Sequence, residues 1–69
     1  MTELFPGRLQ SCRERRRISR RTLSELCGLS KNVVAMYERG ERLPSLDVAV
    51  RLADLLDVSL DWLCGRSPS

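Results

Sequence analysis

The chain has 69 residues, which suffices for one small domain but lies near the lower limit for a core without disulfides or a metal. At 42% hydrophobic and 30% charged residues, its composition is that of a soluble globular protein. Residues 1–42 carry ten basic and five acidic side chains, a net of +5, whereas residues 43–69 carry two and four, a net of −2. A basic half on so small a domain indicates a polyanionic partner such as nucleic acid.

Metal, cofactor and catalytic sites have little support in the sequence. The cysteines are Cys12, Cys27 and Cys64, an odd number without a CxxC pair, and the chain has no histidine. A zinc site would need a carboxylate or an outside ligand in addition, so we expect neither a metal nor a cofactor. A glycine-rich phosphate loop and a nucleophile with its base are also lacking, and we therefore expect no enzyme. We interpret the three thiols as small apolar side chains in a reducing cytosol.

The opening residues, MTELFPGRLQ, lack the basic region and the apolar run of a signal peptide. The longest apolar segments are also too short to span a bilayer. From both observations we expect a cytoplasmic protein.

Helical periodicity runs through the sequence without competing β-type alternation, so we expect an all-α fold. Five helices are predicted, at residues 5–16, 20–27, 31–39, 46–56 and 60–64. Serine is a favoured N-cap because its hydroxyl accepts an otherwise unpaired backbone N–H. Serines precede four of these segments: Ser19, Ser30, Ser45 and Ser59. Glycines follow three of them, where a left-handed residue commonly ends a helix: Gly28, Gly40 and Gly65.

The first predicted helix carries Phe5, Leu9, Cys12 and Arg16 at the spacing of one inward face. Arg13 lies at the edge of that face, where an arginine needs an acidic partner or a path to water. We expect Glu38, on the inward side of the third helix, to be that partner. The alternative is that both side chains reach solvent.

Segments 20–27 and 31–39 are two short helices joined by a turn at Gly28, which permits a sharp reversal of the chain. Leu23 and Leu26 of the first segment would face Val34 and Tyr37 of the second across this turn. That is the layout of a helix-turn-helix, whose second helix lies in the major groove of DNA with its N-terminal part at the base edges.

Segment 46–56 is apolar on two sides, which indicates a helix that is central or also covered by a partner chain. Trp62, the only tryptophan, lies in the short last helix and is expected beside Leu55. A surface tryptophan in so small a chain is typical of an interface, so Leu55 and Trp62 are candidates for a dimer contact.

Residues 18–65, ISRRTLSELCGLSKNVVAMYERGERLPSLDVAVRLADLLDVSLDWLCG, resemble the Cro and phage-repressor helix-turn-helix family, also called XRE-like or lambda-repressor-like. The resemblance rests on YERG, on the P-S-L opening of the fourth helix, on RLADLL and on VSLDWL. It extends back to GRLQSCRERRR and so covers nearly the whole chain. It implies a compact five-helix domain at residues 1–66, with the helix-turn-helix at about 19–39 and a short tail at 67–69.

The family resemblance also implies roles for individual residues. Its base-reading positions fall on Lys31, Asn32, Val33 and Met36. Asparagine pairs with adenine through two hydrogen bonds, lysine donates to guanine or phosphate, and an apolar side chain packs on a thymine methyl. Arg20 falls where the family has a glutamine that grips a phosphate. From their place at the edges of the docking surface, phosphate contacts are also expected of Arg21, Arg39 and Arg42. The family's ion pair between its first and third helices falls on Arg13 and Glu38.

The arginines at the end of the first helix can be interpreted in two ways. Arg15, Arg16 and Arg17 are equally compatible with a solvated helix end, where they complement the helix dipole, and with distant phosphate contacts. The sequence leaves both interpretations open.

We therefore expect a sequence-specific regulator of transcription, most simply a repressor that binds a near-palindromic operator as a homodimer. It would be bacterial or phage-encoded and associated with the nucleoid when bound. One alternative is an antitoxin or interaction module of the same fold that binds a heterologous protein through Leu55 and Trp62. A redox or ligand sensor based on the cysteines is a further alternative.

Overall fold

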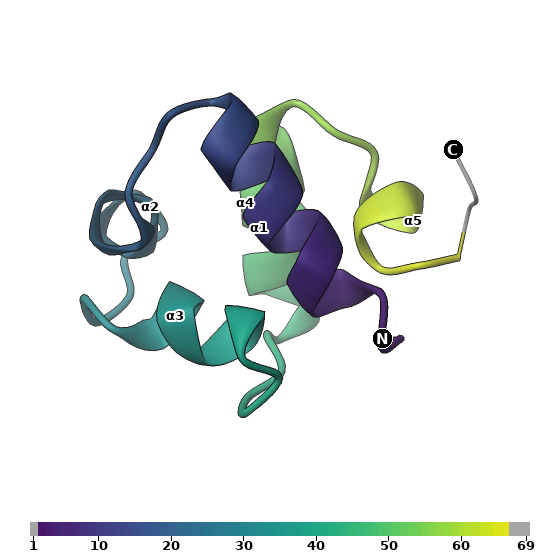
Figure 1. The fold of residues 1–69 in the computed structure, drawn as a ribbon, viewed down its shortest axis with the longest axis horizontal. Coiled ribbons are helices and arrows are strands. Elements are labelled where there is room, and N and C mark those ends of the chain that lie inside the picture. The colour runs from purple at the N-terminus through teal and green to yellow at the C-terminus, as the bar shows by residue number, and fades with distance from the viewer. Residues whose placement is uncertain (1, 67–69) are drawn as a thin grey trace.

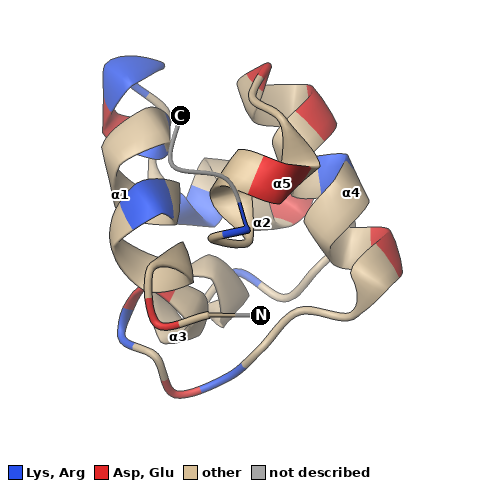
Figure 2. Cartoon of the chain, turned by 90° about the vertical axis from the view of Figure 1, so that its right-hand side faces the viewer, with Lys and Arg blue, Asp and Glu red and all other residues tan. Residues whose placement is uncertain are grey.

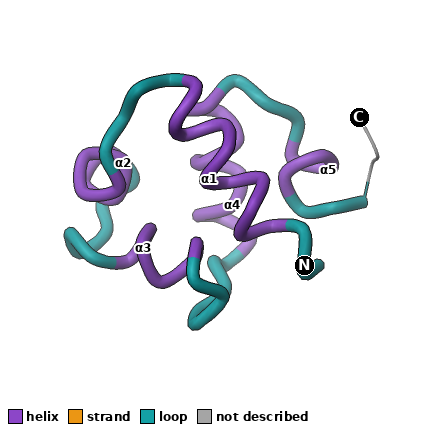
Figure 3. The backbone as a smooth tube through the Cα atoms, viewed as in Figure 1, coloured by secondary structure: helices purple, strands orange, loops and turns teal. Residues whose placement is uncertain are grey.

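The computed structural model describes residues 2–66 and has five helices, as the sequence predicts (Figure 1). The helices are α1 (Phe5–Arg15), α2 (Arg20–Leu26), α3 (Val33–Glu38), α4 (Leu46–Leu56) and α5 (Leu60–Leu63). Figure 3 shows helices and loops and no strand within residues 2–66, which confirms the all-α fold class. The predicted tail, 67–69, lies outside the described residues.

Three of the predicted serine caps are present. The hydroxyl of Ser19 accepts the N–H of Thr22 at 3.0 Å at the start of α2. Ser45 and Ser59 accept the N–H groups three residues further on, at 3.3 and 3.0 Å, at the starts of α4 and α5. Because each bond is made within one turn of chain, the cap positions could be identified from the sequence.

The predicted cap of α3 by Ser30 is wrong. The helix begins at Val33, two residues later than expected, and its N-cap residue Asn32 makes no side-chain cap bond. The backbone carbonyl of Ser30 accepts the Val33 N–H at 3.1 Å in a turn that precedes the helix. The Val34 N–H is instead bonded by the buried hydroxyl of Ser24, in α2, at 3.0 Å. The cap of α3 is thus supplied by a neighbouring helix.

The core gathers around α1, which lies at the centre of Figure 1 with α2 and α3 on one side and α5 on the other. Phe5, Leu9 and Cys12 of α1 are buried as predicted, whereas Arg16, placed on the same face, follows the end of the helix and is exposed. The ring of Phe5 meets that of Tyr37 edge-on, with centroids 6.1 Å apart. The buried residues from the other helices include Leu23, Val34, Leu52, Leu56 and Leu63. The expectation that Leu26 faces α3 is wrong, because this last residue of α2 is 55% exposed.

The apolar surface of α4 is covered on one side only. Ala49, Leu52 and Ala53 are buried, whereas Leu46 and Val50 remain 70% and 40% exposed. The other helices of this small domain pack against a single side of α4, which leaves these two side chains in solvent. The helix is therefore not central.

Contacts from both ends of the chain hold α5 against α1. The backbone N–H and the hydroxyl of Thr2 both donate to the carbonyl of Cys64, at 3.2 and 2.9 Å. Arg8 donates to the carbonyl of Trp62, and its guanidinium lies 4.9 Å from the centroid of the indole ring. Trp62 is therefore half-buried rather than a fully exposed anchor.

Candidate nucleic-acid interface

The helix-turn-helix is formed by α2, the turn at Gly28 and α3. Gly28 has a φ of +72°, a backbone conformation that residues with a side chain rarely adopt. This conformation allows the chain to reverse directly after α2. Arg51, in α4, donates to the carbonyl of Cys27 at 2.7 Å and so braces the turn from behind. The turn is thus held by a residue distant in sequence.

The ion pair between Arg13 and Glu38 is present and fixes α3 to α1. Two guanidinium nitrogens of Arg13 donate to the carboxylate, at 2.6 and 3.2 Å, and a third donates to the carbonyl of Ile18 at 2.9 Å. The side chains are only 11% and 3% exposed. Hydrogen bonding to Glu38 raises the pKa of Arg13 above its ordinary value. This bidentate geometry sets the orientation of α3 on the domain.

The start of α3 presents two exposed polar side chains. Lys31 and Asn32 lie in the turn that precedes the helix and are solvent-exposed. Ala35 and Met36 follow on the helix and are half-exposed, and Met36 also packs against the core. The exposed edge of the turn and of α3 therefore carries four groups in sequence: the ammonium of Lys31, the amide of Asn32, the small side chain of Ala35 and the flexible apolar side chain of Met36.

The structure does not support the prediction of Val33 as a base reader. Its side chain is 5% exposed and belongs to the core. Because α3 begins at Val33 and its inward face is already set by Val34 and Tyr37, the neighbouring Val33 is drawn into the same packed layer. It supports the helix rather than reaching outward.

The predicted phosphate contacts fall into two groups. Within residues 2–66, Arg20 and Arg42 are exposed and form no ion pair. Arg21 pairs with Glu25, with 3.4 Å between nitrogen and oxygen, and Arg39 binds Glu41 through two hydrogen bonds of 2.9 and 3.1 Å. The bonds from Arg39 lower the pKa of Glu41 below its ordinary value.

Charge is distributed unevenly around the molecule (Figure 2). Acidic residues lie on α4 and α5, which hold Asp47, Asp54 and Asp61, whereas most charged residues of α1 are basic. A polyanion would therefore be repelled from the side of α4 and α5 and attracted to the rest of the surface.

Two of the three thiols are buried in the core. Burial raises the pKa of Cys12 and of Cys27 above the ordinary value for a thiol, because the charged thiolate is poorly solvated there. Cys64 is half-buried. No cluster of three or more potential metal ligands is found between residues 2 and 66. In the same part of the chain, every helix is too short or too polar to cross a bilayer.

Two residues that shape this interface were not identified from the sequence. Ser24 donates to the carbonyl of Arg20 at 2.9 Å while it accepts the N–H of Val34, so one hydroxyl joins α2 to α3. Arg51 binds the turn, as described above. For Ser24 the available signal was its inward position one residue after Leu23; no pattern in the sequence links Arg51 to Cys27.

Comparisons with known proteins agree with this geometry. A helix-turn-helix family model matches residues 9–63. The HTH-type transcriptional regulator AnsR of Bacillus subtilis is 41% identical over 59 residues, which are 86% of this chain and 51% of that protein. The cryptic phage CTXphi transcriptional repressor RstR of Vibrio cholerae is 41% identical over 44 residues, 64% of this chain and 39% of RstR. The chain thus spans about half the length of the curated relatives it matches, or less.

A solved structure resembles the whole fold. The P22 c2 repressor, crystallised with synthetic operator 9T, superimposes with a TM-score of 0.86 at 26% identity. The match covers 96% of this chain and 100% of that one. Since the family model covers most of the sequence and the fold agrees throughout, the chain belongs to the helix-turn-helix family of Cro and phage-repressor type, which is not a family of enzymes.

Proposed function

We propose that this domain binds double-stranded DNA sequence-specifically and regulates transcription, most simply as a repressor. The observation that carries the proposal is the pair Lys31 and Asn32, exposed at the entrance of a rigidly held α3. Helices presented in this way enter the major groove with their N-terminal end at the bases. The P22 c2 repressor, which shares the fold, was crystallised with an operator, and this supports the same use here.

Base reading is assigned to Lys31, Asn32 and Met36. The side-chain amide of Asn32 can donate its N–H to N7 of adenine and accept the N6–H with its oxygen. The side chain makes no cap bond that would hold its oxygen and nitrogen in another orientation. Lys31 donates to guanine or to a nearby phosphate, and Met36 packs on a thymine methyl. Ala35 is small enough to let the backbone approach the groove.

Phosphate binding is assigned first to Arg20 and Arg42, whose guanidinium groups have no carboxylate partner among the described residues. Arg21 and Arg39 must first leave Glu25 and Glu41. Exposed pairs of this kind contribute little to stability and are readily exchanged for a phosphate.

A homodimer would place two α3 helices one helical turn apart on a near-palindromic operator. The proposed contact involves Leu55, which is 36% exposed on α4, and the half-buried Trp62 on α5. Repression follows if the dimer occupies a promoter and so excludes the polymerase.

Selection of bound duplexes from a random DNA pool tests this function directly. We expect enrichment of a near-palindrome whose half-sites are centred roughly 10 base pairs apart. A pool that stays random after selection at modest ionic strength would reject sequence-specific binding. Enrichment of a single half-site would leave base reading in place and contradict the homodimer.

Arg20→Ala is expected to reduce the salt dependence of DNA binding, because each phosphate contact releases condensed counterions. The log–log slope of affinity against salt concentration should become shallower by about 0.9. Arg66→Ala, which removes the same charge beyond α5, should leave the slope unchanged. If the slope of Arg20→Ala equals that of the parent protein, Arg20 does not bind phosphate.

A further inference from the structure

Two neighbouring hollows lie between the C-terminal half of α1 and the connection from α4 to α5. Their volumes are about 330 and 380 Å³, and they share Arg15 and Val58. We call them together the α1–α5 groove. It is lined by Cys12, Arg15, Arg16, Leu56, Asp57, Val58, Ser59 and Trp62. In Figure 1, α5 and α3 lie on opposite sides of α1, so the groove is separate from the proposed DNA interface.

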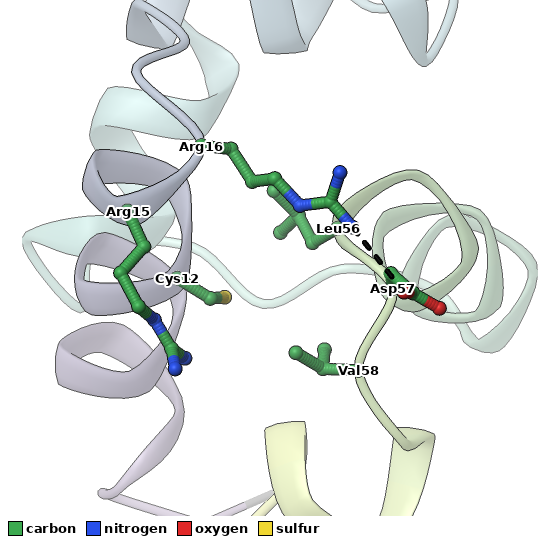
Figure 4. A pocket seen from close by; sticks show the side chains of 6 residues that line it. All are labelled: Cys12, Arg15, Arg16, Leu56, Asp57 and Val58. Atoms are coloured by element: carbon green, nitrogen blue, oxygen red, sulfur yellow. Dashed lines mark ion pairs between the residues drawn. The ribbon is translucent and has the colours of Figure 1, made fainter.

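One wall of the groove is apolar, whereas Arg15, Arg16 and Asp57 line the rest of it. Leu56 and Val58 come from the end of α4 and the loop after it, and Trp62 comes from α5. The Cys12 sulfur points from α1 toward the space between them (Figure 4). Burial raises the pKa of this thiol, so it stays protonated and acts as a neutral wall.

The charges at the rim do not cancel. Arg16 extends across one end of the groove to Asp57, with 3.4 Å between nitrogen and oxygen, and each neutralises the other (Figure 4). Arg15 lines both hollows, is exposed, and forms no ion pair or hydrogen bond through its side chain with any residue from 2 to 66. The groove therefore combines an apolar floor with one uncompensated positive charge.

We propose that the α1–α5 groove binds a small amphipathic monoanion, an aromatic or medium-chain aliphatic carboxylate. The planar guanidinium of Arg15 binds the carboxylate through paired hydrogen bonds, and the apolar body lies against Val58 and Trp62. The two volumes fall at the lower end of the roughly 300–1,000 Å³ range of small-molecule sites, which suits a ligand of metabolite size. A cation of the same shape would be repelled by Arg15. A neutral molecule of that shape would make no charge-assisted hydrogen bond with Arg15.

Trp62 provides the measurement, because it is the only tryptophan of the chain and lines the groove. The protein is titrated with sodium octanoate below micelle-forming concentrations, without DNA, and the fluorescence of Trp62 is followed. We expect a saturable change. Octylamine, with the same chain and the opposite charge, should give none, and octanol should bind about tenfold more weakly.

Two matched variants locate the anion. Arg15→Gln is expected to weaken octanoate binding about tenfold, since a charge-assisted hydrogen bond is lost. Arg17→Gln removes the same charge two residues away, outside the lining of the groove, and should change the affinity by less than about twofold. Both positions are exposed, so both variants should fold as the parent does, which circular dichroism verifies.

Several results would overturn the proposal. These are a fluorescence change that does not saturate, equal responses to octanoate and octylamine, and equal losses in the two arginine variants. The proposed dimer contact also uses Trp62, so the ligand and a second copy compete for this side chain. The titration is therefore made at a protein concentration at which sedimentation shows a monomer. In a separate competition experiment, displacement of octanoate by a duplex of random sequence would show that Arg15 binds phosphate instead. Because the titration contains no DNA, its failure leaves the proposed regulator standing, and that function is tested separately by operator selection.

Discussion

Glu38→Ala is expected to lower the free energy of unfolding by about 3–5 kcal/mol, since it leaves the buried charge of Arg13 without its partner. The two side chains are 11% and 3% exposed, so water cannot replace the lost carboxylate. A domain of this size has a total stability of roughly 3–10 kcal/mol, so most of it would be lost. Urea denaturation followed by far-ultraviolet circular dichroism measures the change.

The control for this prediction is Glu25→Ala. Glu25 also pairs with an arginine, Arg21, but both side chains are exposed, and a change below about 1 kcal/mol is expected. The double variant Arg13→Met with Glu38→Leu should recover much of the loss, because an apolar pair carries no charge that needs a partner. A Glu38→Ala protein as stable as Glu25→Ala would show that the buried pair does not hold α3 in place.

Asn32→Ala is expected to weaken binding to the selected operator by about 1–3 kcal/mol, the discrimination that a bidentate base contact provides. Binding to DNA of unrelated sequence should hardly change, because phosphate contacts carry it. The fold should persist, since Asn32 is exposed and its side chain makes no cap bond. Titration of labelled operator and of scrambled duplex, at one fixed salt concentration, gives both affinities.

Ser30→Ala is the matched control for Asn32→Ala. Ser30 lies in the same turn and is exposed, and only its backbone takes part in the bonding at the start of α3. This variant should bind both duplexes as the parent does. Equal losses on operator and scrambled DNA in Asn32→Ala would assign Asn32 to general affinity rather than to base reading.

Much of the fold could be predicted because it depends on local signals. The caps at Ser19, Ser45 and Ser59 each bond a backbone group three residues away, and the left-handed Gly28 follows directly on its helix. Such contacts are contained within one turn of chain, so the residues themselves specify them. The exposure of Asn32 was also predicted, although this residue lies in the turn before α3 and not on the helix.

Contacts between helices were harder to foresee. Val33 was expected to face outward and is in the core, and the expected Ser30 cap is replaced by Ser24 from α2. Both differences have one cause: α3 begins two residues later than predicted. When the first backbone N–H groups of a helix are bonded by a side chain of another helix, the nearby sequence carries no signal of that cap. The residues next to the start of the helix then face a different direction from the one predicted.

By itself, the sequence determined that the chain forms five helices around a helix-turn-helix and that Arg13 needs Glu38 as its partner. Only the tertiary structure decided which of the arginines predicted to contact phosphate lack a carboxylate partner among the described residues. It also brought Arg15 and Trp62 to one groove. The physical reason is that caps and periodicity act within a few residues of chain. Ion pairs between helices, and the space left between them, depend on how the finished helices pack.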